Sequence, residues 1–276
     1  MKKLVYISLL LALACEEVVI VDLPQPQNLV VIEGWVTDSL SNHPIRITRS
    51  GSFASQNPVP PIEDAQVLVQ ARTGEVFQYT YHENGFYRAN NAYRGITGNE
   101  YRVLAIVDTF EIRSDWDMIP EKVQIQSIQV QSFLENDPNN PGQQITVYYP
   151  KVNVVDPVDS ENYYRWIFYK NDVIYTEPDP ITVQNDRLFN GNLIPNNFRA
   201  FGYDPGDEIT IQLQSISPQG HRYLALLRSQ ITTLGTSSGT TPAIVDGNLF
   251  YVEDDEKRVL GYFGAAAISA DSVEIR

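Results

Sequence analysis

Residues that carry redox and transition-metal chemistry are scarce in this chain, which has one cysteine and three histidines among 276 residues. A lone cysteine forms no internal disulfide and cannot by itself hold a zinc ion. The histidines, His43, His82 and His221, lie far apart and in no His-x-x-His pattern, so a transition-metal site has little support. Phosphate-loop and dinucleotide-binding motifs are also missing. We therefore expect a protein without enzymatic activity, although 34 acidic residues leave a two-carboxylate glycosidase open.

Positive charge is in short supply as well. Lys and Arg number 20 against 34 Asp and Glu, which gives a net charge of −14 at pH 7. A chain this acidic does not bind nucleic acid or anionic head groups by bulk attraction. Hydrophobic residues make up 43% and aromatic residues 11%, enough for a substantial ordered core. The length fits one large or two medium domains.

Long hydrophobic runs are missing too, and the apolar run at the N-terminus is too short to cross a bilayer. Because two lysines precede it, residues 1–14 are predicted to be a signal peptide. The sequence LALAC, ending at Cys15, resembles a bacterial lipobox, in which the cysteine is lipidated and becomes the mature N-terminus. We expect Cys15 to anchor the chain in membrane lipid, because several acyl chains attached to one residue give a stable membrane anchor. The alternatives are a plain secretory peptide with an incidental cysteine, or a free buried thiol.

Two glutamates, Glu16 and Glu17, follow that cysteine. Acidic residues here resemble the signal that sends lipoproteins of Bacteroidota to the outer face of the outer membrane, although they could also be a solubilising start to a tether. Residues 15–28 are predicted to be a lipidated tether, since Pro24 and Pro26 disfavour regular structure. Extended, it reaches about 45 Å. We expect an outer-membrane lipoprotein, lipid-anchored and exposed at the cell surface.

The body of the chain is predicted to be mainly β. Apolar and polar residues alternate around Val67–Ala71 and Phe77–His82, and Asn84-Gly85 predicts a two-residue hairpin turn. Residues 29–119 are predicted to form a first β-sandwich domain, and residues 120–276 a second β-rich, sandwich-like domain.

The second block contains one predicted helix near residues 218–234. Ser217-Pro218 suits the start of a helix, and Tyr223, Leu227 and Ile231 recur at helical spacing. In the strand before it, apolar residues alternate with polar ones: Ile209, Ile211 and Leu213 with Thr210, Gln212 and Gln214. We therefore expect the polar face of this strand to be exposed to solvent.

Two sets of residues are candidates for binding. Tyr164, Trp166 and Phe168 share one face of an aromatic strand, which would stack sugar rings or a peptide if it were open. The favoured alternative is that this face is packed in the core. Acidic turns provide the second set: Asp204, Asp207, Asp254 and Asp255 could hold calcium, although plain solvated turns are the favoured interpretation.

Several segments resemble known families. NPVPPIEDAQVLV, NGFYRA and GITGNEYRVLA make the first block similar to the small transthyretin-like or carboxypeptidase-regulatory sandwich, whose members are usually spacers or docking units. Together with LVVIEGWVTD and VLGYFGAAAIS, the order of motifs resembles the Bacteroidota outer-membrane lipoprotein family catalogued as domain of unknown function 4249. This resemblance implies a partner of a TonB-dependent receptor β-barrel, and it implies no catalytic residues.

Two other functions stay open alongside a non-enzymatic transporter partner in ligand capture or nutrient uptake. One is a surface module that binds glycans or peptides, or a hydrolase that cleaves them. The other is an adhesion or scaffold lipoprotein. The ligand itself is not indicated by any motif.

Overall fold

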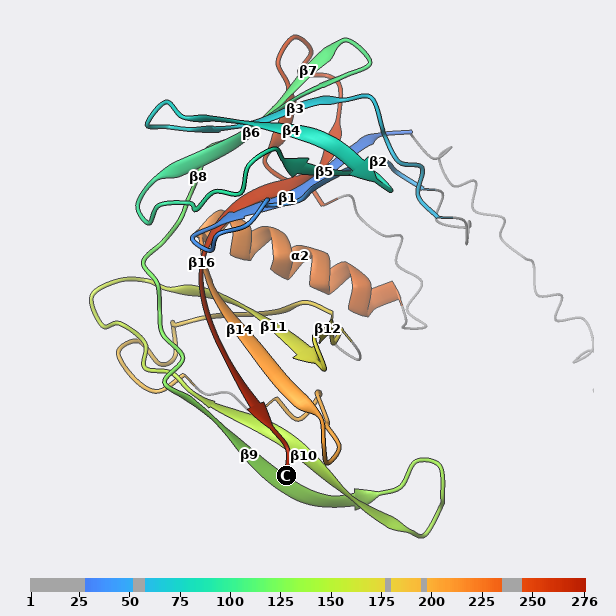
Figure 1. Ribbon diagram of the computed structural model, residues 1–276, viewed down its shortest axis with the longest axis vertical. Coiled ribbons are helices and arrows are strands. Elements are labelled where there is room, and N and C mark those ends of the chain that lie inside the picture. The colour runs from blue at the N-terminus through green and yellow to red at the C-terminus, as the bar shows by residue number, and fades with distance from the viewer. Residues whose placement is uncertain (1–27, 52–57, 177–179, 195–197, 235–244) are drawn as a thin grey trace, which may run out of the picture.

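The computed structural model describes residues 28–51, 58–176, 180–194, 198–234 and 245–276. Within these ranges the chain is mainly β-strand with a single helix, α2, at Pro218–Leu234 (Figure 1). The expected all-β class with one helix is therefore confirmed. The predicted signal peptide and the lipidation site Cys15 lie outside the described ranges.

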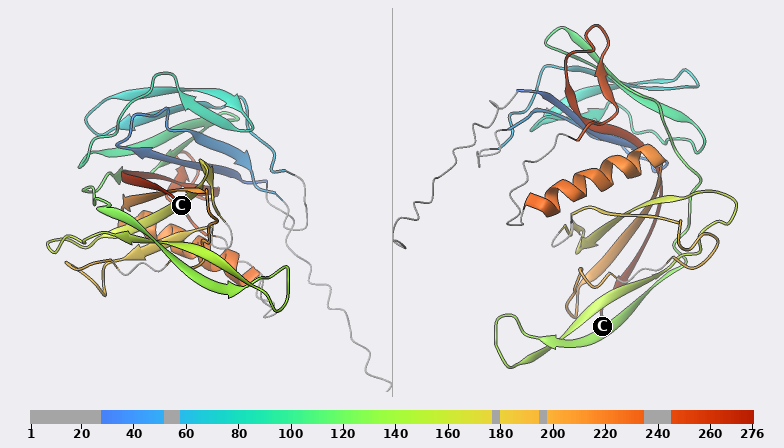
Figure 2. Two further views of the ribbon diagram at one scale, coloured as in Figure 1. Left: turned by 60° about the horizontal axis from the view of Figure 1, so that its bottom comes forward. Right: turned by 180° about the vertical axis from the view of Figure 1, so that it is seen from behind.

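The first half of the chain forms two facing layers of strands around a hydrophobic core (Figure 2). Its strands are β1 (Val30–Thr37), β2 (Ile45–Arg49), β3 (Gln66–Ala71), β4 (Val76–Glu83), β5 (Phe86–Ala89), β6 (Glu100–Val107), β7 (Phe110–Ser114) and β8 (Asp117–Met118). With β15 (Leu249–Tyr251) and β16 (Val259–Glu274) from the end of the chain, they form one sheet in the order β16-β1-β2-β5-β4-β3-β6-β7-β15, and β8 pairs with β6 beside this path. Since β15 also contacts β16, the sheet curls over its own core and is sandwich-like.

The second half extends the same sheet. Its elements are β9 (Ser127–Asn136), β10 (Gln144–Asn153), β11 (Tyr163–Lys170), β12 (Val173–Ile174), β13 (Thr182–Asn185), β14 (Glu208–Ile216), α2, β15 (Leu249–Tyr251) and β16 (Val259–Glu274). The hairpin β9–β10 is a separate two-stranded sheet that covers one face of β11 and β14. Helix α2 covers part of the other face (Figure 2). The second half is thus a sheet with a different cover on each side.

The long strand β16 joins the two halves. Its first part, Val259–Ala266, runs parallel to β1, and its last part, Ala266–Glu274, runs antiparallel to β14. The predicted domain boundary at residues 119–120 falls between β8 and β9, yet β15 and β16 pair with strands that precede it. One continuous sheet therefore crosses that boundary.

Local sequence signals correspond to the observed turns and caps. Asn84 and Gly85 have φ of 50° and 81° and connect β4 to β5, which is the two-residue turn predicted for this pair. The hydroxyl of Ser217 accepts a hydrogen bond from the N–H of Gly220 at 3.0 Å and so caps α2. These features depend only on residues close in sequence.

The polar face of β14 differs from the sequence expectation. Gln214 is only 5% exposed, although the alternation of apolar and polar residues in its strand predicts that this face is exposed to solvent. Ile216 lies on the same face of β14 and packs in one cluster with Leu224 of α2. Because the helix covers this end of the sheet, Gln214 is buried with it. The apolar stripe of α2 is also shorter than expected, since Ile231 is 41% exposed.

Candidate functional site

The aromatic strand β11 is part of the core. Tyr164, Trp166 and Phe168 are 0%, 3% and 2% exposed. Phe168 stacks on Phe201 with ring centres 4.0 Å apart, and Trp166 packs against Phe198 at 4.9 Å. This corrects the expectation of an open binding platform, because side chains of the loop before β14 cover the rings. The packed alternative describes all three residues.

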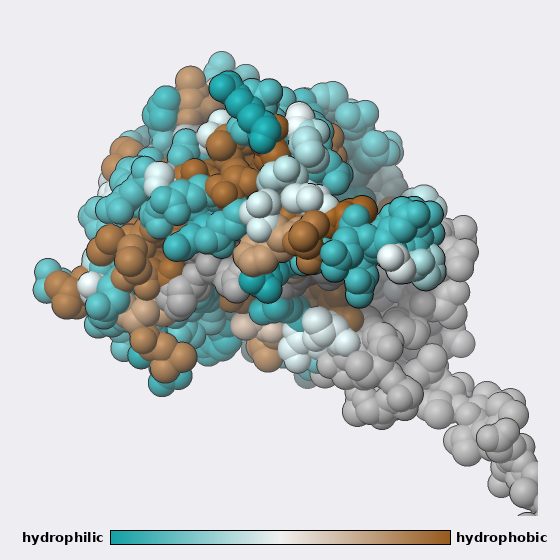
Figure 3. Space-filling model, turned by 90° about the horizontal axis from the view of Figure 1, so that it is seen from below, coloured by the Kyte–Doolittle hydropathy of each residue, from teal (hydrophilic) through white to brown (hydrophobic). Residues whose placement is uncertain are grey.

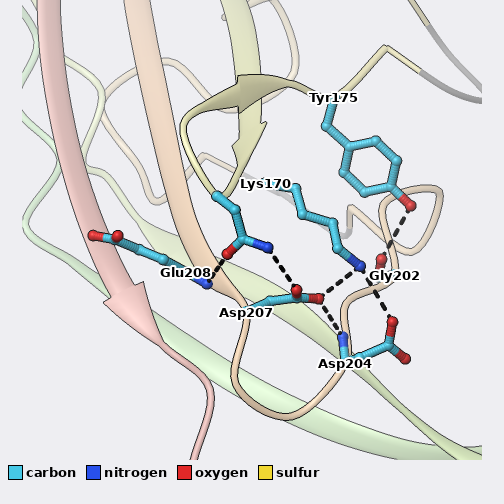
Figure 4. Close-up of polar contacts among 7 residues, drawn as sticks. Lys170, Tyr175, Gly202, Asp204, Asp207 and Glu208 are labelled. Carbon is cyan, nitrogen blue, oxygen red and sulfur yellow. Dashed lines mark hydrogen bonds and ion pairs between the residues drawn. The ribbon is translucent and has the colours of Figure 1, made fainter.

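Asp204 and Asp207 belong to an ion-pair network at the end of β11 (Figure 4). The Lys170 ammonium lies 2.6 Å from Oδ2 of Asp207 and 3.2 Å from Oδ2 of Asp204. Asn171 donates its side-chain N–H to Oδ1 of Asp207 at 2.9 Å, and the N–H of Asp204 donates to Oδ2 of Asp207 at 2.8 Å. Both carboxylates therefore face a cation that the chain itself supplies.

Electrostatics agree with a structural role for Asp207. Burial alone would raise the pKa of Asp207, but the hydrogen bonds from Lys170, the Asp204 N–H and Asn171 outweigh it and lower that pKa below its usual value. The ammonium of Lys170 stands where a calcium ion bound between Asp204 and Asp207 would have to lie. The geometry fits the favoured interpretation, turns without calcium, and a calcium site at these two residues stays a prediction.

Asp254 and Asp255 lie in the loop that joins β15 to β16. Oδ1 of Asp254 accepts the N–H of Glu256 at 3.2 Å, and Oδ2 lies 3.6 Å from Nζ of Lys257. Asp255 is exposed. Among the residues that the structure describes, no group of three or more His, Cys, Asp or Glu side chains could hold a metal ion. The acidic turns are solvated or paired with lysine.

A cleft opens at the end of the sandwich, beside that loop. It has a volume of about 510 Å³, and we call it the β7–β15 cleft. Its lining residues are Asn28, Leu29, Arg49, Asp108, Phe110, Tyr251, Glu256, Lys257 and Arg258. A second hollow of about 610 Å³ lies along the same loop and shares Tyr251, Lys257 and Arg258. The cleft therefore gathers aromatic and charged groups near the first described residue after the predicted tether.

A tight turn positions one wall of the β7–β15 cleft. Asp108 and Thr109, between β6 and β7, have φ of 56° and 126°. Positive φ is costly for a β-branched residue such as Thr109, and strain of this kind is concentrated at functional sites. The Asp108 carboxylate pairs with Arg49 of β2, and Phe110 follows the turn directly. The turn and the ion pair thus hold Phe110 at the rim.

A second surface lies on the loops that join β10 to β11 and β13 to β14 (Figure 1). Four apolar side chains are exposed there, and we call them the loop patch: Val155 (45%), Val158 (66%), Leu188 (97%) and Leu193 (62%). Buried Asp156 fixes these loops, since it accepts the Tyr164 hydroxyl and the Gly191 N–H. From below, hydrophobic residues form separate brown areas among hydrophilic ones (Figure 3). The four side chains are thus apolar groups that these loops leave open to solvent.

A buried carboxylate sits where the two halves meet. Asp117 is 3% exposed, and its Oδ2 accepts the Tyr262 hydroxyl at 3.2 Å and the Ala265 N–H at 3.0 Å. Burial raises the pKa of Asp117 to about 6, although hydrogen bonds from Ser217, Ala265 and Tyr262 oppose the rise. Asp117 therefore links β8, β16 and the start of α2 through a group that titrates near neutrality.

Sequence reasoning did not find the residues of the β7–β15 cleft. Phe110 is far in sequence from the segment that holds Tyr251 and Lys257, and pairing of β7 with β15 brings the two segments together. The available signal was the run LFYVEDDEKR, where aromatics precede four acids and two bases. No helix among the described residues is long and apolar enough to span a membrane.

A curled, mainly β sheet with one helix among the described residues places this chain in the class of β-sandwich-like proteins. Residues 16–272 match the family described as Domain of unknown function (DUF4249), and the chain belongs to this family. The membership predicted from its motifs is thereby confirmed. A search of curated proteins found no match.

Proposed function

We propose that this protein is a lipid-anchored component of the outer membrane that captures a ligand at the cell surface and works with a TonB-dependent transporter, without catalysing a reaction. The β7–β15 cleft would hold the ligand, and the loop patch would contact the transporter. The observation that carries the proposal is the loop patch, because Leu188 is 97% exposed on loops that a buried carboxylate holds in place.

The anchor supports the same function. The sequence LALAC followed by Glu16 and Glu17 resembles a lipobox with a surface-export signal. A tether of residues 15–28 reaches about 45 Å, which keeps the body close to a membrane protein. The net charge of −14 does not favour direct contact with anionic head groups.

Co-purification from detergent-solubilised outer membrane tests the partner. The native protein should bring down a β-barrel receptor, and the double variant V158D/L188D should lose it because charge cannot be buried at an apolar interface. Leu40 is 61% exposed in the β1–β2 connection, so L40D is a matched control that should retain the receptor. Absence of a barrel from the native pull-down, or its retention by V158D/L188D, would contradict this partner.

The anchor has a separate test. Replacing Cys15 by serine removes the thiol that lipidation needs. The C15S chain should not incorporate a labelled fatty acid and should leave the membrane fraction on washing. Equal labelling of C15S and the native chain would exclude Cys15 as the lipidated residue.

A further inference from the structure

Two aromatic rings meet at the rim of the β7–β15 cleft. Phe110 begins β7 and Tyr251 ends β15, and these strands are paired. The ring centres are 6.0 Å apart and the ring planes are at 87°. Phe110 remains 36% exposed. The two rings form adjacent walls of a corner that opens toward the cleft.

That corner already holds an ammonium group. Nζ of Lys257 lies 3.3 Å from the centre of the Phe110 ring and 5.8 Å from that of Tyr251. A carboxylate oxygen of Asp254 lies 3.6 Å from the same nitrogen. Perpendicular aromatic walls with a nearby carboxylate form the type of cage that recognises organic ammonium ions. Here the cage is filled by a side chain from the adjoining loop.

The cleft is larger than its present occupant. A volume of about 510 Å³ exceeds what one lysine ammonium needs, and Arg49 is neutralised by Asp108. If Lys257 left, the loop would keep four acids, at residues 253–256, and one base, Arg258. A net charge of −14 on the whole chain also raises the local concentration of cations.

We propose that the β7–β15 cleft binds a ligand through an organic ammonium group, and that Lys257 occupies the ammonium position while the cleft is empty. Binding then exchanges one cation for another over Phe110 and Tyr251. This inference rests on the proposed role of the cleft in ligand capture, and it names the chemical class of that ligand.

Choline is a suitable probe, measured by titration calorimetry on the full chain in detergent at low ionic strength. K257A should bind choline at least fivefold more tightly than the native chain, because the internal competitor is gone. F110L/K257A should bind at least tenfold more weakly than K257A, since leucine keeps the apolar bulk but lacks the π face. K151A, which removes an exposed lysine from β10, should match the native chain.

Three outcomes would overturn the inference: equal affinity of K257A and the native chain, equal affinity of K257A and F110L/K257A, or binding of 3,3-dimethylbutanol as tightly as choline. Unfolding midpoints measured on the same samples show whether each variant is folded. Vesicles of phosphatidylcholine in place of choline distinguish a lipid head group from a soluble ligand as the source. Receptor co-purification does not depend on choline, so either proposal can fail without the other.

Discussion

The indole of Trp35 lies directly over Gly264. A Cβ on residue 264 would stand 2.4 Å from Cζ3 of the ring, closer than any side chain tolerates. The two residues are paired between β1 and the parallel strand β16. They belong to EGWVTD and VLGYFGA, two of the segments that resemble the family. The two motifs thus form a single structural unit from opposite ends of the chain.

Replacing Gly264 by alanine should lower the free energy of unfolding by about 1–3 kcal/mol, because the added methyl overpacks the Trp35 ring. Urea unfolding measures the change. Gly51 is the control, since a Cβ there makes only an ordinary 3.4 Å contact, so G51A should be near neutral. In a W35A background, G264A should lower the free energy of unfolding by less than it does in the native chain. An equal loss in both backgrounds would show that the added methyl does not act through the Trp35 ring.

Replacing Tyr164 by phenylalanine should destabilise the second half. The Tyr164 hydroxyl donates to Asp156, which is 2% exposed, so the variant leaves a buried carboxylate short of one donor. The expected loss is about 1–3 kcal/mol by urea unfolding. Y163F is the matched control, because the neighbouring Tyr163 hydroxyl donates to exposed Glu161. Equal effects of Y163F and Y164F would count against the network.

Asp207 and Asp204 should differ in their effect on stability. Asp207 accepts three hydrogen bonds and its side chain is 12% exposed, whereas the Asp204 side chain pairs with Lys170 and is 73% exposed. D207A should cost about 1–3 kcal/mol, and D204A clearly less. Millimolar calcium should leave the thermal midpoint of the native chain unchanged. A calcium-dependent rise that D207A abolishes would restore the calcium interpretation.

Asp117 should make stability depend on pH in an identifiable direction. Its pKa in the folded chain is raised to about 6 from 3.8, so the folded state binds a proton more readily than the unfolded state. Its contribution is therefore fully present below pH 3.8 and is lost as the pH rises through 6.

The variant D117N isolates this titration. Between pH 7.5 and pH 4.5 the native chain should gain roughly 2 kcal/mol of unfolding free energy relative to D117N. Chemical denaturation of both chains at several pH values measures the difference. A difference that stays flat over this range would show that Asp117 does not titrate there.

Features with local signals were predictable from the sequence. The turn at Asn84-Gly85 needs only two residues that tolerate positive φ, and α2 needs only its cap at Ser217 and a 3.6-residue period. Alternation along β11 also predicted that Tyr164, Trp166 and Phe168 share one face. None of these inferences requires knowledge of what lies opposite.

Which element packs on each face of the sheet could not be predicted in the same way. The alternating pattern of β14 predicts that Gln214 is exposed to solvent. It is buried instead, because α2 packs over this end of the sheet. The alternation of residues in β11 fits an exposed aromatic platform as well as a face packed in the core. The β7–β15 cleft depends on strand pairing between residues that no local motif links.

By itself, the sequence determined that this is an acidic, mainly β protein with one helix near residues 218–234 and membership of its family. The tertiary structure alone decided that β16 joins both halves, that the β11 aromatics are core, and that Lys257 fills a corner between Phe110 and Tyr251. The reason is physical: periodicity and turn chemistry act over a few residues, whereas burial and cation–π contact depend on which distant strands become neighbours.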